Sequence, residues 1–447
     1  MIVDFQGNSV ATIRKIWWRN TFSLTKWRHH MESSYNSMNT KLTRGFKYRN
    51  FFWMEFAYVM TLLFVYATRF NDVSKALANV YAVYMLARIV SVLVVGLKRL
   101  PGRDIYILSA LVIFFCLNLI VNVRSTNFLD AIKIFAIFIF YFSGKSVSSG
   151  FFNVFPKKTW IRIFVLLPVL ISVLDMFFRV SGSGDTVGDT GVGFFSNRNN
   201  AVLFSVVSCW LFILAKTNRW IILAYVVGAA VVFKTLGALA ALGAAICIVL
   251  LGKNVLKLGL AAGALILAFI LFRHEISVFG RAENALSGVT GALSASGGLQ
   301  GLGRMNYAQL AHAAGTTDIS FIFRLKHWMN LFEIYRSGDI WHQVFGFGVD
   351  SSIDLTDLSL LPHNDYLRFL FEMGPVFFIA FLAMNSLIVL RIGRNMLMVP
   401  AIFMLVYCFS DNIVNNFLVM STFYFLAGAI IARSRSTTQY ENHAAVI

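Results

Sequence analysis

The chain has 447 residues, of which 58% are hydrophobic and only 13% are charged. This fraction of charged residues is too low to give a soluble protein of this size an ordinary polar surface, so we predict an all-α integral membrane protein. The formal net charge of +18 is expected to mark cytoplasmic loops and anionic lipid headgroups. Nucleic acid is not an expected partner, because the basic residues are scattered among loops.

Apolar runs long enough to cross a bilayer recur along the chain, and a span of roughly 20 apolar residues is expected to be helical. Residues 1–50 are polar and basic and are predicted to be a cytoplasmic segment without a cleavable signal peptide. Lys234 alone separates two short runs, which leaves open whether they form two spans or one broken span. We predict about twelve transmembrane helices, at 51–69, 75–97, 105–123, 128–143, 159–179, 200–216, 219–234, 235–252, 254–272, 376–392, 396–411 and 415–433.

The distribution of Lys and Arg predicts the orientation, because short cytoplasmic loops collect these residues. Every second turn is basic, and the opposite turns include the acidic stretch SGSGDTVGDTGVG and the stretch SDNIVNN. We therefore expect both termini, including a tail at 434–447, to be cytoplasmic. Transmembrane domains are then expected at 51–272 and 376–433, and the large loop at 273–375 would lie outside, which in a bacterium is the periplasm. The basic residues of the inner turns are Lys98, Arg99, Arg103, Lys145, Lys157, Lys158, Lys216, Arg219, Lys253, Lys257, Arg391, Arg394, Arg433 and Arg435.

The outer insertion has two parts with different composition. Residues 283–306 are rich in Gly, Ser and Ala, and we predict that they form a mobile cover. After Phe321 the pattern becomes helical, and 363–372 follows as a second helix between Pro362 and Gly374. We expect Arg324, Lys326 and His327 to point away from the apolar face of the first helix or to lie along its rim. That apolar face, which suits the membrane surface, consists of Phe321, Leu325, Trp328, Phe332 and Tyr335.

His363 is the leading candidate for chemistry, because it lies within a few residues of a span and an imidazole can act as a general base near neutral pH. A simple loop-capping role stays open, and position alone does not separate it from the other histidines of the insertion. Arg324 could bind phosphate oxygens through its guanidinium, or it could be an arginine that only touches lipid headgroups. The other histidines of the insertion are His274, His312, His327 and His342.

Further cations face the same compartment in this topology. Arg198 precedes a helix that Asn199 or Asn200 could cap, and Lys234 lies at another outer helix end. Either residue could instead be a plain anchor. No metal or nucleotide signature is found and no cofactor is expected, although Asp350, Asp354, Asp357 and Asp365 lie close in sequence, which leaves an acidic metal site open.

Polar and thiol groups within the spans need a separate interpretation. Glu55 with Arg88, and Asp130 with Lys133, are candidate ion pairs, and a transporter would need such charges near the midplane. The four cysteines all lie in apolar runs and are predicted to be small core residues: Cys116, Cys209, Cys247 and Cys408.

The segments RLKHWMNL at 324–331, FGFG at 345–348 and PHNDYLRFLFEMG at 362–374 resemble the bacterial O-antigen ligase and polymerase superfamily, and GFFSNRNNAV at 193–202 is similar to another of its loops. The resemblance covers roughly the second half of the chain. It implies transfer of a glycan from undecaprenyl diphosphate at the periplasmic face, with a second lipid-linked repeat unit or the lipid A core as acceptor.

Within this resemblance, His363 matches the catalytic histidine and Arg324 an arginine that holds the diphosphate. Trp328, Asn364 and Tyr366 match motif positions and are expected to bind substrate. The sequence departs from the family where many members have Ser-Arg-Gly at a helix start, because Gly237 and Ala238 stand there. Lys234 and Arg198 are the candidates for the missing charge.

The leading hypothesis is a metal-independent polymerase that joins lipid-linked repeat units of a surface polysaccharide. A ligase differs only in its acceptor, and a polysaccharide or lipid transporter is the alternative from another class. The glycosyltransferase hypothesis predicts an exterior pocket at the lipid boundary in which His363 meets at least two cations.

Overall fold

The computed structural model describes residues 71–147, 198–214, 217–233, 235–251, 277–315, 320–356, 359–393 and 396–444, with isolated positions between 162 and 174 and between 254 and 270. The predicted segment at 1–50 and the span at 51–69 lie outside the described residues. The spans at 159–179 and 254–272 are described only at those isolated positions.

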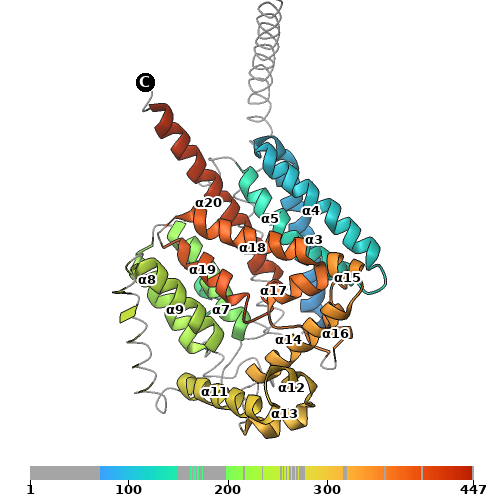
Figure 1. Cartoon of the computed structure of the whole chain (residues 1–447). Coiled ribbons are helices and arrows are strands. Elements are labelled where there is room, and N and C mark those ends of the chain that lie inside the picture. The colour runs from blue at the N-terminus through green and yellow to red at the C-terminus, as the bar shows by residue number, and fades with distance from the viewer. Residues whose placement is uncertain are drawn as a thin grey trace, which may run out of the picture. The chain divides into compact units, whose positions relative to one another are not determined.

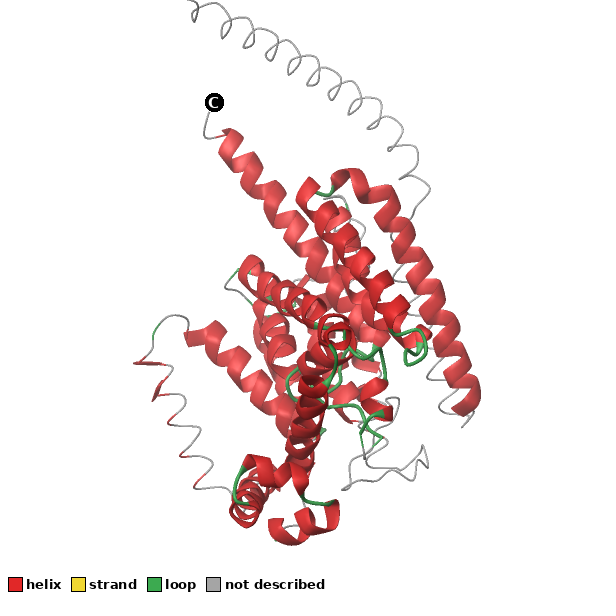
Figure 2. Cartoon of the chain, turned by 45° about the vertical axis from the view of Figure 1, so that its right-hand side comes forward, coloured by secondary structure: helices red, strands yellow, loops and turns green. Residues whose placement is uncertain are grey.

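Every regular element in the described residues is a helix, as Figure 2 shows, which confirms the all-α class. In chain order the elements are α3 (Asn71–Gly96), η1 (Leu97–Arg99), α4 (Gly102–Val121), α5 (Phe128–Ser146), α7 (Arg198–Leu214), α8 (Arg219–Val232), α9 (Leu236–Leu251), α11 (Ser277–Ser296), α12 (Leu299–Arg304), α13 (Tyr307–Ala314), α14 (Ser320–Ser337), α15 (Ile340–Phe345), α16 (Ser351–Asp354), α17 (Asp365–Arg368), the π-helix η3 (Phe369–Met373), α18 (Pro375–Ile392), α19 (Met398–Tyr407) and α20 (Phe417–Ala444).

Two of the described helices, α4 and α18, have the length and apolar composition to cross a membrane on their own. Large apolar side chains point outward from both of them, such as Ile113 and Ile120 on α4 and Ile379 and Leu390 on α18. A helix that is apolar on its outer face as well as its inner face suits lipid better than water. These helices indicate membrane association, while the count of twelve spans stays a prediction.

The apolar runs on both sides of Lys234 form two separate helices, because α8 ends at Val232 and α9 begins at Leu236. In Figure 1, α7, α8 and α9 lie together beside α19, which packs against α7 and α9. The last predicted span is longer than expected. α20 continues to Ala444 as one helix, so it includes most of the residues of the predicted cytoplasmic tail at 434–447, which stays a prediction.

Close packing of α5 against α20 depends on two glycines. A Cβ atom at Gly144 would lie 2.0 Å from the carbonyl oxygen of Phe425, and one at Gly428 would lie 2.2 Å from that of Tyr141. Such small residues let two helix backbones approach, which is the packing expected where lipid rather than water surrounds the helices.

Several helix ends meet at one end of this bundle. The amide of Asn127, at the start of α5, donates to the carbonyl of Val349 at 3.1 Å, so the α4–α5 turn contacts the loop after α15. The opposite ends of the same two helices carry basic residues. There Lys145 pairs with Asp104, and Arg99 of η1 donates to the carbonyl at the C-terminus of α5 at 3.5 Å.

The segment predicted to be a mobile cover is folded into helices. α11, α12 and α13 pack around a small core of Ala292, Leu302, Leu310 and Ala314, which Ile322 of α14 completes. Alanine and serine favour helix, and the glycines at the turns allow the chain to reverse, so the composition is compatible with short packed helices as well as with a loop.

α14 was expected to place one apolar face on the membrane, with its polar residues outside. Phe321 and Phe332 of the apolar face are exposed, at 45% and 52%, but the expected outward position of the polar residues is wrong for Lys326 and His327, which are only 3% and 2% exposed. Lys326 is buried because its ammonium donates to the carbonyl of Gly303 on α12 at 2.8 Å. The helix is therefore covered on its polar side by α12 and α13.

Candidate functional site

His363 adopts a backbone conformation that is uncommon for its residue type, with φ at +49°. It follows Pro362 and immediately precedes Asn364, the N-cap of α17. The left-handed conformation costs energy for any residue with a Cβ atom, so neighbouring contacts must hold this short connection in place. The imidazole is 39% exposed, and it is therefore within reach of a substrate.

The partner of His363 is Asp411, in the turn Cys408–Asn412 between α19 and α20, here called the Asp411 turn. The imidazole Nδ1 lies 3.1 Å from Asp411 Oδ1. A carboxylate only accepts hydrogen bonds, so the proton is on Nδ1 and the lone pair of Nε2 stays available as a base. Two further donors hold the carboxylate, namely its neighbour's backbone amide (Asn412, 2.9 Å) and the side-chain amide of Asn199 on α7.

α14 holds both sides of this pair in place. Arg324 Nη1 donates to the carbonyl of Ser410 in the Asp411 turn at 3.0 Å. One helical turn later, the indole of Trp328 donates to the carbonyl of Pro362, directly before His363, and packs edge-on against Phe409 with ring centroids 5.4 Å apart. Residues four apart share a helix face, so this spacing brings the arginine and the tryptophan to the same site.

The structure brings the predicted cations together in part. Arg324 is in contact with the Asp411 turn. Arg198 is the first residue of α7, next to Asn199, although its side chain lies outside the described residues. Asn199 itself is inside the helix and bonds Asp411, so the expectation that it caps α7 is wrong. Lys234 also lies outside the described residues. The helix that follows it begins close to the site, since a Cβ atom at Gly237 would lie 2.8 Å from the hydroxyl of Ser410.

Asn364 and Tyr366 make hydrogen bonds within the protein, and their role in substrate binding stays a prediction. The side-chain oxygen of Asn364 accepts the amide of Leu367 at 3.1 Å as the N-cap of α17. The hydroxyl of Tyr366 donates to the carbonyl of Leu405 on α19 at 2.6 Å. Both contacts fix the segment that carries His363, and the side chain of Asn364 is almost fully buried.

A buried polar network anchors α17 and η3 behind the site. Arg368, only 2% exposed, donates to the carboxylates of Glu372 and Asp350, both at 2.8 Å, and to the side chain of Asn415. Burial raises the pKa of Asp350 to about 6, with Arg368 opposing the shift. Separating a buried ion pair would leave a charge without a partner, so these contacts hold α17, the helix that follows His363, in one position.

Asp365 has a different environment from its neighbours. It is fully buried, and its Oδ2 accepts the backbone amides of Ile413 and Val414 at 2.9 and 3.2 Å. Its Oδ1 has no hydrogen-bond partner among the described residues. Burial raises the pKa of Asp365 to about 8, although Arg368 and the two amides oppose the shift. The group is therefore mostly protonated at neutral pH, and it pins the α19–α20 connection to α17.

The residues Gly346–Gly348 form a packing element. The amides of Phe347 and Gly348 donate to the carbonyls of Phe371 and Glu372 at 2.9 and 3.0 Å. Gly346 has φ at +78°, and a Cβ atom there would lie 2.5 Å from the carbonyl carbon of Glu372. Glycine is therefore required for this loop to lie against η3.

The described histidines of the insertion differ in their surroundings. His327 is buried beside His363, and burial lowers its pKa to about 4, with the Leu360 carbonyl partly opposing the shift. His342 pairs with Asp339 at 3.0 Å at the start of α15, and His312 is exposed at the end of α13. Among these, His363 alone combines an aspartate partner with an arginine on the same turn. His274 lies outside the described residues.

The residue that the sequence did not single out is Asp411. It lies in the stretch SDNIVNN, which was noted only as an outer turn. The only local indication of a role for Asp411 was that it is a single aspartate in an outer turn, close to the end of a predicted span. The pairing itself depends on contact between segments 48 residues apart, which no local pattern reveals.

No protein-family model matches the chain, and no curated protein matches it. The resemblance to the O-antigen ligase and polymerase superfamily therefore remains a prediction from the motifs.

The exterior pocket predicted around His363 stays a prediction. A cavity of about 640 Å³ lies between α11, α12 and α13, and His363 does not line it. Two of the aspartates considered for a metal site have different partners. Asp350 pairs with Arg368, and Asp365 accepts a backbone amide after the Asp411 turn.

The four cysteines are free thiols. Asp130 and Lys133 form the expected pair at 2.8 Å.

Proposed function

We propose that the chain is a membrane glycosyltransferase that joins glycans carried on undecaprenyl diphosphate, and that it polymerises the repeat units of a surface polysaccharide. The observation that carries this proposal is the His363–Asp411 pair at 3.1 Å with Arg324 bonded to the same turn. An oriented base beside a fixed guanidinium is the arrangement that transfer from a diphosphate requires.

Each bond change and proton transfer of the proposed reaction can be assigned. The acceptor hydroxyl attacks the anomeric carbon of the donor glycan, and its proton passes to Nε2 of His363. The bond between that carbon and the diphosphate oxygen breaks, and undecaprenyl diphosphate leaves with the electron pair. Asp411 stabilises the imidazolium that forms, in the way a carboxylate orients a catalytic histidine.

Arg324 is the proposed ligand of the leaving diphosphate. A guanidinium has five N–H donors, and the Ser410 carbonyl occupies Nη1 of this one. The remaining donors suit phosphate oxygens, whose negative charge grows as the bond breaks. Arg198 is the proposed second cation, because the neighbouring residue Asn199 bonds Asp411. The described residues contain no group of three or more side chains that could hold a metal ion.

Charge supports the placement of this reaction at the outer face of a bacterial inner membrane. The His363 site lies where α19 ends and α20 begins, and Asn127 at the start of α5 reaches the same region through Val349. Lys145, at the opposite end of α5, belongs to the basic residues that are expected to face the cytoplasm. Both termini would then be cytoplasmic.

The proposal is tested with the full-length protein reconstituted in bilayers and given an undecaprenyl diphosphate-linked repeat unit. Longer lipid-linked glycans are expected from the native chain, and none from His363→Ala. His342→Ala is the matched control, since His342 also pairs with an aspartate but lies on α15. Absence of any longer glycan with the native chain overturns the polymerase proposal. Transfer only when a lipid A core is added would assign the ligase reaction instead.

A transporter gives the opposite result in the same membranes. It would move the lipid-linked glycan across the bilayer without lengthening it, and His363→Ala would leave that movement unchanged. The charged residues expected to matter for transport are Glu55 and Arg88. Glu55 and the side chain of Arg88 lie outside the described part of the structure.

A further inference from the structure

The short helix α15 exposes a compact set of apolar side chains, here called the α15 patch: Ile340, Trp341 and Val344. Their exposed fractions are 65%, 62% and 36%. α15 is held from behind, because Tyr335 of α14 donates to the carbonyl of Gln343 at 2.6 Å. An exposed tryptophan and isoleucine on a fixed helix indicate a surface that is covered in the working protein.

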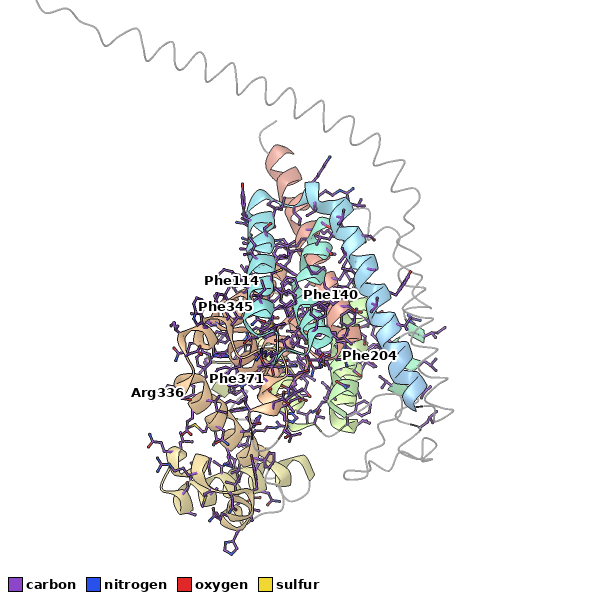
Figure 3. The ribbon with its side chains drawn as sticks, turned by 90° about the vertical axis from the view of Figure 1, so that its right-hand side faces the viewer. Phe114, Phe140, Phe204, Arg336, Phe345 and Phe371 are labelled. Atoms are coloured by element: carbon purple, nitrogen blue, oxygen red, sulfur yellow. The ribbon has the colours of Figure 1, made fainter. Side chains whose placement is uncertain are left out.

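The α15 patch is continuous with a candidate membrane span. The Trp341 ring stacks on Phe345 with centroids 6.2 Å apart, and Phe345 lies 6.3 Å from Phe114 of α4 (Figure 3). α15 packs against both α4 and α18, the two described helices that can cross a bilayer by themselves. Further along α4, Ile120 is 70% exposed. The apolar surface of the span therefore continues directly onto α15.

The turn after α4 extends the same apolar surface, and basic residues accompany it. Val123 and Phe128 are 74% and 63% exposed, although a turn between two spans would ordinarily present polar side chains to water. Arg124 lies between them and is exposed. Arg336 is exposed as well, and its backbone carbonyl accepts the side-chain amide of Gln343 on α15 at 3.2 Å. Apolar side chains flanked by arginines match the boundary between acyl chains and lipid phosphates.

We propose that α15 is an interfacial membrane anchor. Ile340, Trp341 and Val344 lie at the level where acyl chains meet headgroups, and Arg124 and Arg336 face the lipid phosphates. Lipid is the occupant that these observations favour, because the patch is the end of a lipid-compatible helix surface rather than an isolated one. This assigns membrane contact to α15. The sequence pattern assigned membrane contact to the apolar face of α14, which holds Phe321, Leu325, Trp328, Phe332 and Tyr335, and that assignment stays a prediction.

The anchor has a direct connection to the His363 segment. α15 leads into Gly346–Gly348, whose amides bond the carbonyls of Phe371 and Glu372 in η3. η3 continues α17, which Asn364 caps immediately after His363. The depth at which α15 sits in the bilayer therefore determines the height of His363 above it. The lipid contact itself does not depend on glycosyl transfer.

Tryptophan fluorescence in nanodiscs tests the anchor. The full-length protein and Trp341→Phe are placed in nanodiscs whose lipids carry bromine near the headgroup end or near the end of the acyl chains. The difference between the two proteins is the signal of Trp341. We expect this signal to be quenched at least about twofold more by bromine near the headgroups, because interfacial helices sit only about 5–10 Å into the bilayer. Aqueous iodide is expected to quench it weakly.

Two further variants complete the experiment. Trp210→Phe is the matched control, since Trp210 is fully buried and its signal should respond to neither quencher. If Trp341→Phe fails to fold, Ile340→Trp places an added indole on the same patch and is expected to show the same quenching by lipid. Strong quenching of the Trp341 signal by iodide overturns the proposal, because the residue then faces water. Protection from both quenchers also overturns it, because protein rather than lipid then covers the patch.

Discussion

Replacing Asp411 with asparagine removes the negative charge beside His363 while keeping a side chain of the same shape. The asparagine oxygen can still face Nδ1 of His363 and the amide of Asn412, which lie at 3.1 and 2.9 Å from Asp411 Oδ1. Its amide can face Asn199 if that side chain turns its oxygen inward. The change therefore removes the charge on the partner of the imidazole with little change in packing.

The expected effect follows from the charge that is lost. A hydrogen bond to a charged group contributes about 1.5–3 kcal/mol. If the bond to Asp411 strengthens by that amount when His363 accepts a proton, its loss slows the chemical step roughly 10- to 150-fold, at about 1.4 kcal/mol per factor of ten. The whole contribution of a general base is about 10²–10⁴-fold. Asp411→Asn is therefore expected to lose part of the activity that His363→Ala loses.

The assay is the rate at which a lipid-linked repeat unit is lengthened in reconstituted membranes, at saturating donor. Asp339→Asn is the matched control, because Asp339 pairs with His342 at 3.0 Å in the same way but outside the site. Its rate is expected to equal that of the native chain. Thermal unfolding of each variant separates a loss of rate from a loss of folded protein.

The double variant gives the decisive comparison. If Asp411 acts through His363, adding Asp411→Asn to His363→Ala should cost nothing further, because the partner is already absent. An equal loss in both backgrounds would refute the reasoning, since Asp411 would then act independently of the imidazole. Full activity of Asp411→Asn alone would refute it as well.

Three other changes have defined outcomes. Arg324→Lys keeps the charge but loses the planar pair of donors, so the KM for the lipid-linked donor should rise about tenfold. Glu372→Gln removes the carboxylate that lies 2.8 Å from the buried guanidinium of Arg368. It should lower the free energy of unfolding by about 3–5 kcal/mol. Adding Arg368→Met removes the unpaired charge and should recover part of this loss in a thermal unfolding measurement. Burial raises the folded-state pKa of Asp365 from 3.8 to about 8, so its contribution to stability is full below the lower value and is lost as pH rises through the higher one. Because Asp350 and His327 also have shifted pKa values in this range, the measured quantity is the melting temperature of the native chain relative to that of Asp365→Asn, which should fall as pH rises; parallel curves would contradict this.

The sequence was sufficient for the features that depend on neighbouring residues. Runs of apolar residues predicted the helices α3, α4, α5, α7 and α18 to within a few positions, because helix formation in an apolar run needs only local hydrogen bonds. Arg324 was expected to point away from the apolar face that holds Trp328 or to lie along its rim, and only the structure shows that both residues contact the same site. The position of His363 close to a span did not separate it from the other histidines of the insertion, and it was chosen because the segment 362–374 resembles a family motif.

The tertiary structure decided which face of each helix is covered and which side chains meet. α14 carries apolar and polar residues on several sides, and only the packing of α12 and α13 buries Lys326 instead of Phe332. Asp411 becomes the partner of His363 because the α19–α20 turn comes back to α17, a contact between segments far apart in the chain. The spacing of apolar residues shows which face of a helix can be buried. Which face is buried depends on the helices that pack against it, and the sequence pattern does not identify these.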